Sequence, residues 1–209
     1  QPERATAMAA RISEWADDIG FSFENKAPLT APVPTIAILA KNQLLRFVNH
    51  GVKGSTSSLQ LDGKSWLDLP AFRAPKVAGG RSLQIKGTID PTSPSGVILA
   101  HGGNHAGYSV YLDEDHLCFA ACVNKKRTVV RSSSAITGSA NFEANWNSKG
   151  EVFLKVNGKL VGKEQAGIIR HEPGDSIQIG ADQIQPVGNY NPPNRFSGTI
   201  ENLTFKYPT

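Results

Sequence analysis

The densest group of carboxylates in the chain is Asp113, Glu114 and Asp115. Retaining glycosidases need two carboxyl groups about 5–5.5 Å apart, flanking the bond that they cleave. In this sequence the three acids fill a polar stretch between two apolar runs, a composition typical of a solvated turn. We therefore expect a hairpin turn here. A glycoside hydrolase or lyase stays open as an alternative, and it requires carboxylates gathered inside a groove.

Two histidines and two cysteines have spacings that merit a test for metal or redox chemistry. His101 and His105 bracket Gly102-Gly103-Asn104, and two histidines four apart can share a metal on a helix. A Gly-Gly segment is not helical, so we expect a plain surface loop. Cys118 and Cys122 would lie about 13 Å apart along a strand. A disulfide needs Cα atoms within about 7 Å, so both are expected to be reduced core residues.

Aromatic rings can stack on the faces of sugars, and the candidates are Trp66, Trp146, Tyr108 and Tyr190. In alternating strands most aromatic rings face the core, which we expect for the two tryptophans. Tyr190 stands in the polar, proline-containing segment 189–193, so it is the ring that we most expect at the surface. Tyr190 is therefore the first carbohydrate-binding candidate among the aromatic residues, and Trp146 is a second candidate if its ring faces outward.

Four basic residues cluster near one end of an expected hairpin: Lys125, Lys126, Arg127 and Arg131. They can contact a sulfated or carboxylated glycan by charge-assisted hydrogen bonds. A solvated turn that keeps the protein soluble is the alternative. The net charge of +4 over 209 residues is too small and dispersed to indicate nucleic acid as a partner. No apolar run approaches the roughly 18 residues of a membrane helix, so we expect no membrane span.

From about Gln43 onward the chain reads as short β runs separated by turn residues. About a dozen strands are expected, within 58–61, 66–69, 82–89, 97–100, 108–112, 117–123, 127–131, 141–147, 151–156, 159–162, 176–180 and 199–206. Asn157-Gly158 is the strongest turn dipeptide, and a change of parity near Asn202 suggests a bulge. Because no helical pattern separates the strands, an antiparallel sandwich or barrel is expected.

The sequence pattern before Gln43 differs from that of the β runs. In residues 2–20 an apolar stripe of helical period, formed by Met8, Ile12, Trp15 and Ile19, predicts one α-helix. The sequence KAPLTAPVPT follows over 26–35, and its three prolines indicate an extended linker. We expect a helical segment over 1–25, a Pro-rich linker over 26–42 and a β-sandwich over 43–209.

Five segments in order resemble the concanavalin A/laminin-G-like superfamily: SSLQLDGKSWLDLP, RSLQIKGTIDPTSPSGVILAHGG, AGYSVYLDEDHLCFAACVN, GEVFLKVNGKLVGK and FSGTIENLTF. The matching residues run from Leu59 to Phe205, most of the chain. The resemblance implies an all-β fold, a jelly-roll sandwich of two antiparallel sheets.

The resemblance also implies a possible calcium site, since many family members hold one Ca²⁺ at the sandwich rim with oxygen ligands. The matching loop lies between the last two expected strands. Asp182, Asn189 and Asn191 are its candidate ligands, although Asp182 is its only carboxylate.

The segment PERATAMAARISEWADDIG over 2–20 is similar to the last helix of many arylsulfatase-type catalytic domains. Some of these enzymes carry a laminin-G-like module at the C-terminus. The sulfatase nucleophile motif is absent, so any sulfatase activity is expected upstream of Gln1. This resemblance implies a preceding catalytic domain in the same chain and an extracellular or periplasmic location.

The expected function is a non-catalytic accessory module that binds a glycan, anionic or sulfated, or that braces the catalytic domain. Besides the hydrolase or lyase, a protein-interaction or adhesion module remains an alternative. The hypothesis of an adhesion module predicts a contiguous exposed apolar patch of more than several hundred Å².

Overall fold

The computed structural model describes residues 35–40, 43–55 and 57–206. All of them belong to the second of two compact units, Pro34–Thr209. The helix predicted over 2–20 and most of the predicted linker lie outside the described residues. Within the described part, no helix is long and apolar enough to cross a membrane.

The described chain is all-β apart from one short 3-10 helix, Ala71–Arg73. The strands in chain order are β1 Thr35–Ala40, β2 Gln43–His50, β3 Lys53–Gly54, β4 Ser58–Asp62, β5 Trp66–Leu69, β6 Leu83–Pro91, β7 Gly96–Gly102, β8 Ala106–Asp113, β9 His116–Val123, β10 Lys126–Ala135, β11 Ala140–Trp146, β12 Glu151–Val156, β13 Lys159–Gln165, β14 Ile177–Ile179 and β15 Ser197–Lys206.

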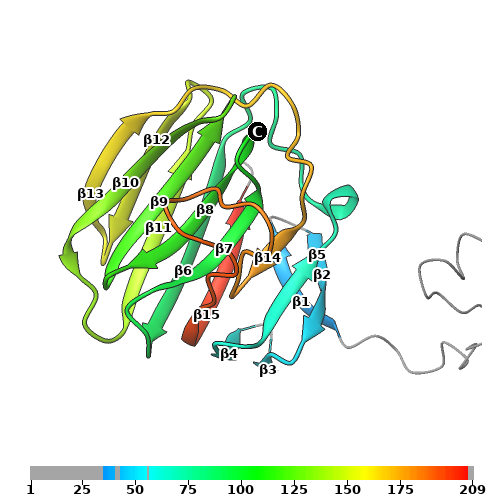
Figure 1. The fold of residues 1–209 in the computed structure, drawn as a ribbon, viewed down its shortest axis with the longest axis vertical. Helices are drawn as coiled ribbons and strands as arrows, with labels where there is room; N and C mark the ends of the chain where they lie inside the picture. The colour runs from blue at the N-terminus through cyan, green and yellow to red at the C-terminus, as the bar shows by residue number, and fades with distance from the viewer. Residues whose placement is uncertain (1–34, 41–42, 56, 207–209) are drawn as a thin grey trace, which may run out of the picture. The chain divides into compact units, whose positions relative to one another are not determined.

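The strands form two stacked antiparallel sheets, as Figure 1 shows. One layer has the order β10-β9-β8-β7-β14-β5-β2, and the other has the order β15-β6-β11-β12-β13, with β4 beside β15 and β3 beside β4. At the far edge of the sandwich β10 contacts both β12 and β13 across the gap between the layers. The predicted sandwich of two antiparallel sheets is confirmed.

The hairpin of β1 and β2 joins the two layers at the opposite edge. β2 pairs with β5 in the first layer, while β1 pairs in parallel with β15 of the second through Ala40 and Phe205. The sandwich therefore includes Thr35–Ala40, a stretch expected to be linker. The three prolines that indicated the linker all precede Thr35, so they do not interrupt the pairing of β1.

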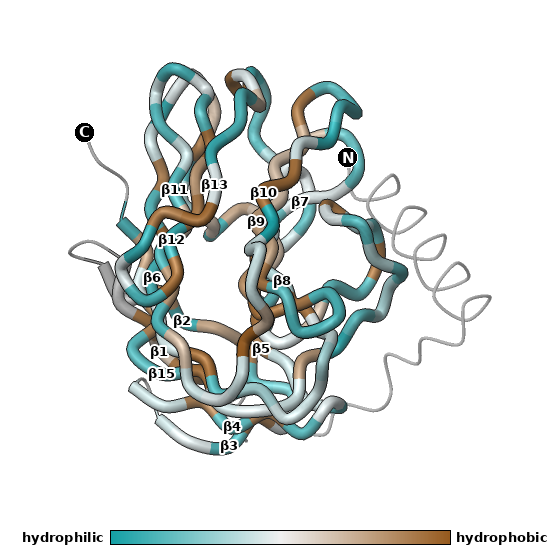
Figure 2. The backbone as a smooth tube through the Cα atoms, turned by 90° about the vertical axis from the view of Figure 1, so that its left-hand side faces the viewer, coloured by the Kyte–Doolittle hydropathy of each residue, from teal (hydrophilic) through white to brown (hydrophobic). Residues whose placement is uncertain are grey.

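The two layers bury their side chains differently. In β6 the apolar residues alternate with polar ones, so one face packs on the core and the other faces outward. In contrast, β7, β8 and β9 are buried along nearly their whole length on both faces. Residues 181–195, which we call the strap, supply Val187 and Tyr190 to a second apolar cluster on the outer face of these strands. Figure 2, coloured by hydropathy, shows brown segments along both layers.

The predicted tight turns are present. Glu114 and Asp115 have positive φ between β8 and β9, and Asn157-Gly158 has positive φ at both residues between β12 and β13. Positive φ at both central positions is the geometry of hairpin turns that match the strand twist. The predicted bulge near Asn202 is also confirmed, because the register of β15 against β6 shifts between Glu201 and Thr204.

Candidate functional site

The basic residues predicted to bind glycan are divided by the fold. The guanidinium of Arg127 is hydrogen-bonded to the strap. Its Nε donates to the carbonyl of Val187 at 2.6 Å, and its Nη1 donates to Oδ1 of Asn189 at 3.1 Å. Arg131 pairs with Asp113 at the end of β8. Lys125 and Lys126 are exposed and form neither an ion pair nor a side-chain hydrogen bond among the described residues. The four residues therefore do not form one basic cluster. Arg127 is hydrogen-bonded to the strap, Arg131 is in a surface ion pair, and the two lysines are solvated.

Tyr190 is not the exposed ring that its polar, proline-containing segment predicted. Its ring packs edge-on against Tyr111, with centroids 4.8 Å apart. Its hydroxyl lies 2.9 Å from Oγ of Ser109 and donates to Oδ2 of Asp182 at 2.7 Å. Burial raises the pKa of Tyr190 above its usual range, and the neighbouring Asp182 adds to this shift. Tyr190 therefore anchors the strap on the sheet.

The predicted calcium ligands do not form a site suited to Ca²⁺. Asp182 is buried, and burial raises the pKa of its carboxyl although Tyr190 and backbone N–H groups of Val187 and Ile184 donate hydrogen bonds to it. A hard cation needs oxygen acceptors around it, whereas these neighbours are donors. Oδ1 of Asn189 accepts from the Arg127 guanidinium, a positive charge that would repel a cation. Asn191 is exposed, and within the described residues it forms no hydrogen bond with Asp182.

The two tryptophans have different surroundings. Trp146 is buried, and its Nε1 donates to the carbonyl of Gly167 at 3.0 Å, so it is a core residue and offers no ring to a sugar. Trp66 is half-buried; His50 stacks on it at 4.4 Å, and the Arg195 guanidinium lies 4.9 Å from its centroid. The ring of Trp66 is thus already engaged by side chains of the protein.

The acidic cluster 113–115 lies at the β8–β9 turn, as predicted. Asp113 and Glu114 lie near Arg131, and the backbone of Asp115 bonds to Pro94 and Ile136. The carboxylates of Asp113 and Glu114 therefore face Arg131 at the hairpin turn. His101 differs from the prediction of a surface loop, because it belongs to β7 and is buried, while His105 is exposed.

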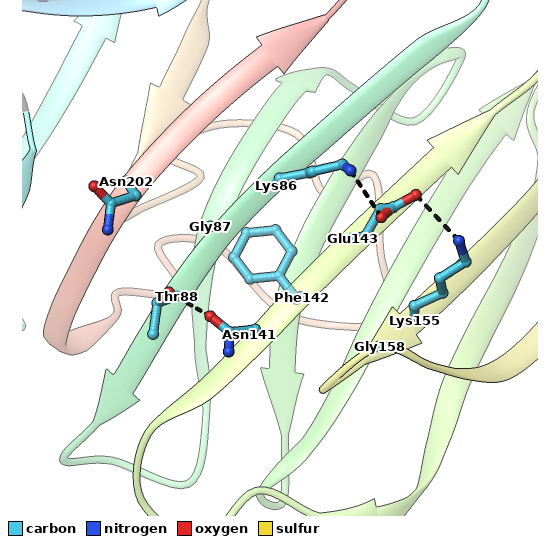
Figure 3. Close-up of a pocket in the computed structure, with 9 residues that line it drawn as sticks. All are labelled: Lys86, Gly87, Thr88, Asn141, Phe142, Glu143, Lys155, Gly158 and Asn202. Carbon is cyan, nitrogen blue, oxygen red and sulfur yellow. Dashed lines mark hydrogen bonds and ion pairs between the residues drawn. The ribbon is translucent and has the colours of Figure 1, made fainter.

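A different surface brings polar side chains together: the outward face of β6, β11 and β12. The register pairs Lys86 with Glu143 and Glu143 with Lys155, so these three side chains form one row across the strands. A second row pairs Gln84 with Asn145 and Asn145 with Phe153. A hollow of about 330 Å³ lies over the first row, and we call it the Glu143 pocket. Its lining residues, seen in Figure 3, are Lys86, Gly87, Thr88, Asn141, Phe142, Glu143, Lys155, Gly158 and Asn202.

Glu143 is the centre of the hydrogen-bond network in this pocket. Lys86 Nζ lies 2.9 Å from its Oε2, and Lys155 Nζ lies 3.4 Å from its Oε1 (Figure 3). The amide groups of Gln84 and Asn145 also donate to Oε1, each at 3.1 Å. Partial burial raises the pKa of Glu143, but the hydrogen bonds from Lys86 and Asn145 and the two lysine charges outweigh it. The pKa lies below its usual value.

The unused hydrogen-bonding capacity of the pocket consists mainly of donors. An ammonium group has three N–H donors, and the side chains of Lys86 and Lys155 are 42% and 36% exposed. Thr88 donates to Oδ1 of Asn141, which leaves the Asn141 amide N–H₂ without a partner among the described residues. Two lysines against one carboxylate give the lining a charge of +1. The pocket is therefore suited to bind an anionic group that has several hydrogen-bond acceptors.

Sequence reasoning overlooked this pocket, although one signal was present. Asn141, Glu143 and Asn145 alternate with apolar residues in β11, which marks an outward polar face on one strand. The partners Lys86 and Lys155 are 57 residues before and 12 residues after Glu143. Only the register of β6 and β12 brings them together.

No protein-family model matches the sequence, and no curated protein matches it. Solved structures do match the fold. Domains LG4–5 of the mouse laminin α1 chain superpose with a TM-score of 0.57 at 18% identity, covering 75% of this chain and 43% of that one. The botulinum neurotoxin serotype D binding domain gives a TM-score of 0.57 at 14% identity, covering 81% and 47%. The fold is a concanavalin A-like β-sandwich.

A third concanavalin A-like match is botulinum neurotoxin type C, whose cell entry depends on interaction with two ganglioside molecules. It superposes with a TM-score of 0.55 at 14% identity, covering 84% of this chain and 48% of that one. The present chain spans less than half the length of these laminin and toxin chains. At such low identity the likeness establishes the concanavalin A-like fold and no more.

Proposed function

We propose that this chain is a non-catalytic module that binds an anionic glycan in the Glu143 pocket. The observation that carries the proposal is the row Lys86–Glu143–Lys155 on an outward sheet face, with its unused N–H donors directed at a hollow. Sulfate and carboxylate groups accept such charge-assisted hydrogen bonds. The fold supports the proposal as well, since structural neighbours include a toxin that uses gangliosides.

Phe153 adds an apolar surface beside the polar row. It is half-buried on the outward face of β12, next to Asn145 in the register, and Lys155 Nζ lies 5.8 Å from its ring centroid. An aromatic ring beside amide and ammonium donors provides both contacts that a sugar requires, an apolar face and hydrogen bonds.

The chemistry of Glu143 favours binding over hydrolysis. A glycosidase uses a pair of carboxyl groups, one of them a general acid with a raised pKa. The Glu143 pocket has one carboxylate in its lining, and the pKa of that group is lowered. Its oxygens accept from Lys86, Lys155, Gln84 and Asn145, so it orients donors and stays ionised.

The test is titration calorimetry of the 209-residue chain with a heparin tetrasaccharide and with uncharged maltotetraose. We expect the heparin fragment to bind with an affinity that falls as salt rises, because the pocket charges are exposed. Lys86→Gln and Lys155→Gln are each expected to weaken binding about tenfold, the loss of one charge-assisted hydrogen bond.

The matched control is Lys126→Gln, which removes the same charge from the exposed end of β10. Its affinity for the tetrasaccharide should equal that of the wild type, and thermal unfolding should confirm that all three variants fold. If Lys126→Gln weakens binding and the pocket variants do not, the ligand binds at the hairpin end. Equal affinity for maltotetraose would contradict the preference for anions.

We also propose, from the sequence over 2–20 alone, that the module follows a sulfatase-type catalytic domain and acts outside the cytoplasm. The gene sequence upstream of Gln1 tests this directly. A sulfatase nucleophile motif, Cys or Ser followed by x-Pro-x-Arg, and a secretory signal are expected there. Any other upstream sequence refutes this part without affecting glycan binding.

A further inference from the structure

A second hollow, of about 270 Å³, lies where the end of β10 faces the β12–β13 hairpin. We call it the serine groove. Its lining residues are Ser132, Ser133, Ser134, Ala135, Ile136, Thr137, Ser139, Ala140, Val156, Asn157, Lys159 and Val161. The lining includes neither the strap nor the residues of the Arg131 ion pair.

The serine groove and the Glu143 pocket flank the same turn. Asn157 lines the groove and Gly158 lines the pocket; Ala140 and Asn141 divide in the same way. The turn is fixed to the start of β11, because Asn157 Oδ1 accepts from the backbone N–H of Asn141 at 2.9 Å. Ala140 is three residues from Glu143, which corresponds to about 10 Å along the strand. A ligand longer than a single sugar can therefore reach both hollows.

The lining of the serine groove suits a sugar chain. The hydroxyls of Ser133, Thr137 and Ser139 have no side-chain hydrogen bond within the described residues, and all three residues are exposed. Between them lie aliphatic side chains, of which Ile136 is buried and Val161 half-buried. Lys159 is exposed and forms no ion pair among the described residues. The groove thus combines free hydroxyls, an apolar floor and one positive charge.

We propose that the serine groove is a second subsite, so that the module binds an extended polyanionic glycan across the Asn157-Gly158 turn. This inference rests on the proposed function of the Glu143 pocket. One acidic group of the chain lies against Lys86 and Lys155, and a later one lies against Lys159. Sugar hydroxyls between these positions bond to Ser133, Thr137 and Ser139. The turn is exposed, and at Gly158 even an added Cβ would meet nothing within 4 Å, so a chain can cross it.

The experiment measures affinity as a function of glycan length. Heparin oligosaccharides of two, four, six and eight sugars are titrated into the wild type and into the double variant Thr137→Val/Lys159→Gln. The wild type should gain about tenfold in affinity between two and six sugars. The double variant should bind the shortest fragment within twofold of the wild type and lose most of the gain with length.

The matched control is the double variant Lys126→Gln/Thr128→Val, which makes the same chemical changes on β10. Lys126 is six residues from Ser132, about 20 Å along the strand. This variant should keep the full gain with length. The subsite is refuted if short fragments bind through Lys155 but affinity does not rise with length, or if the groove variant keeps the rise. Failure of short fragments to depend on Lys155 would instead refute the proposed function.

Discussion

At the scale of single residues, burial distinguishes two histidines that are four residues apart, since His101 is buried and His105 is exposed. His101 lies in the core, with Nδ1 3.2 Å from the hydroxyl of Tyr108 and the two rings edge-on. Its Nε2 has no hydrogen-bond partner within the described part of the chain. Burial lowers the pKa of His101 from 6.5 to about 3, so the ring is neutral in the folded protein.

This buried histidine predicts a pH dependence of stability. Between pH 6.5 and about 3 the unfolded chain binds a proton at His101 that the folded protein does not. The free energy of unfolding should therefore fall with decreasing pH, by about 2 kcal/mol between pH 7.5 and pH 5 from this residue. Urea unfolding at both pH values measures it. His101→Leu should remove this part of the slope, whereas His105→Leu, at an exposed position, should retain it.

At the scale of elements, the strap shows why two of the predicted site residues have surroundings that their local sequence does not indicate. Tyr190 and Asn189 stand in a segment whose composition indicates an exposed loop, yet the segment folds back on the sheet. The sequence does contain an indirect signal, since β9 is an uninterrupted apolar run, and strands buried on both faces need a cover. What the sequence does not reveal is which loop provides it, because Arg127 and Val187 are 60 residues apart.

Loosening the strap should expose the two free cysteines. Cys118 and Cys122 belong to the cluster that includes Val187, and both are buried. Arg127→Gln removes guanidinium hydrogen bonds to Val187, Pro186 and Asn189. Thiol labelling under native conditions is expected to accelerate about tenfold or more, because it tracks the opening of the strap. The same charge change in Lys126→Gln should leave labelling slow. An unchanged labelling rate in Arg127→Gln would mean that closure of the strap does not depend on these hydrogen bonds.

At the scale of the whole molecule, the two-sheet sandwich was predictable because its local signals agree with one another. Turn dipeptides such as Asn157-Gly158 delimit alternating runs, and five segments in order resemble the family. The Glu143 pocket was not predictable in the same way. It depends on the register of three strands, and no local pattern records that Lys86 faces Glu143.

We expect an anionic glycan to bind on the outward face of β6, β11 and β12. Amide chemical-shift mapping of the isotope-labelled chain, titrated with a heparin tetrasaccharide, tests it most directly. Saturable shifts are expected at Lys86, Thr88, Asn141, Glu143 and Lys155, with little change at 124–127 and in the strap. Shifts confined to 124–127 or to residues 181–195, with the Glu143 pocket unperturbed at saturation, would contradict it.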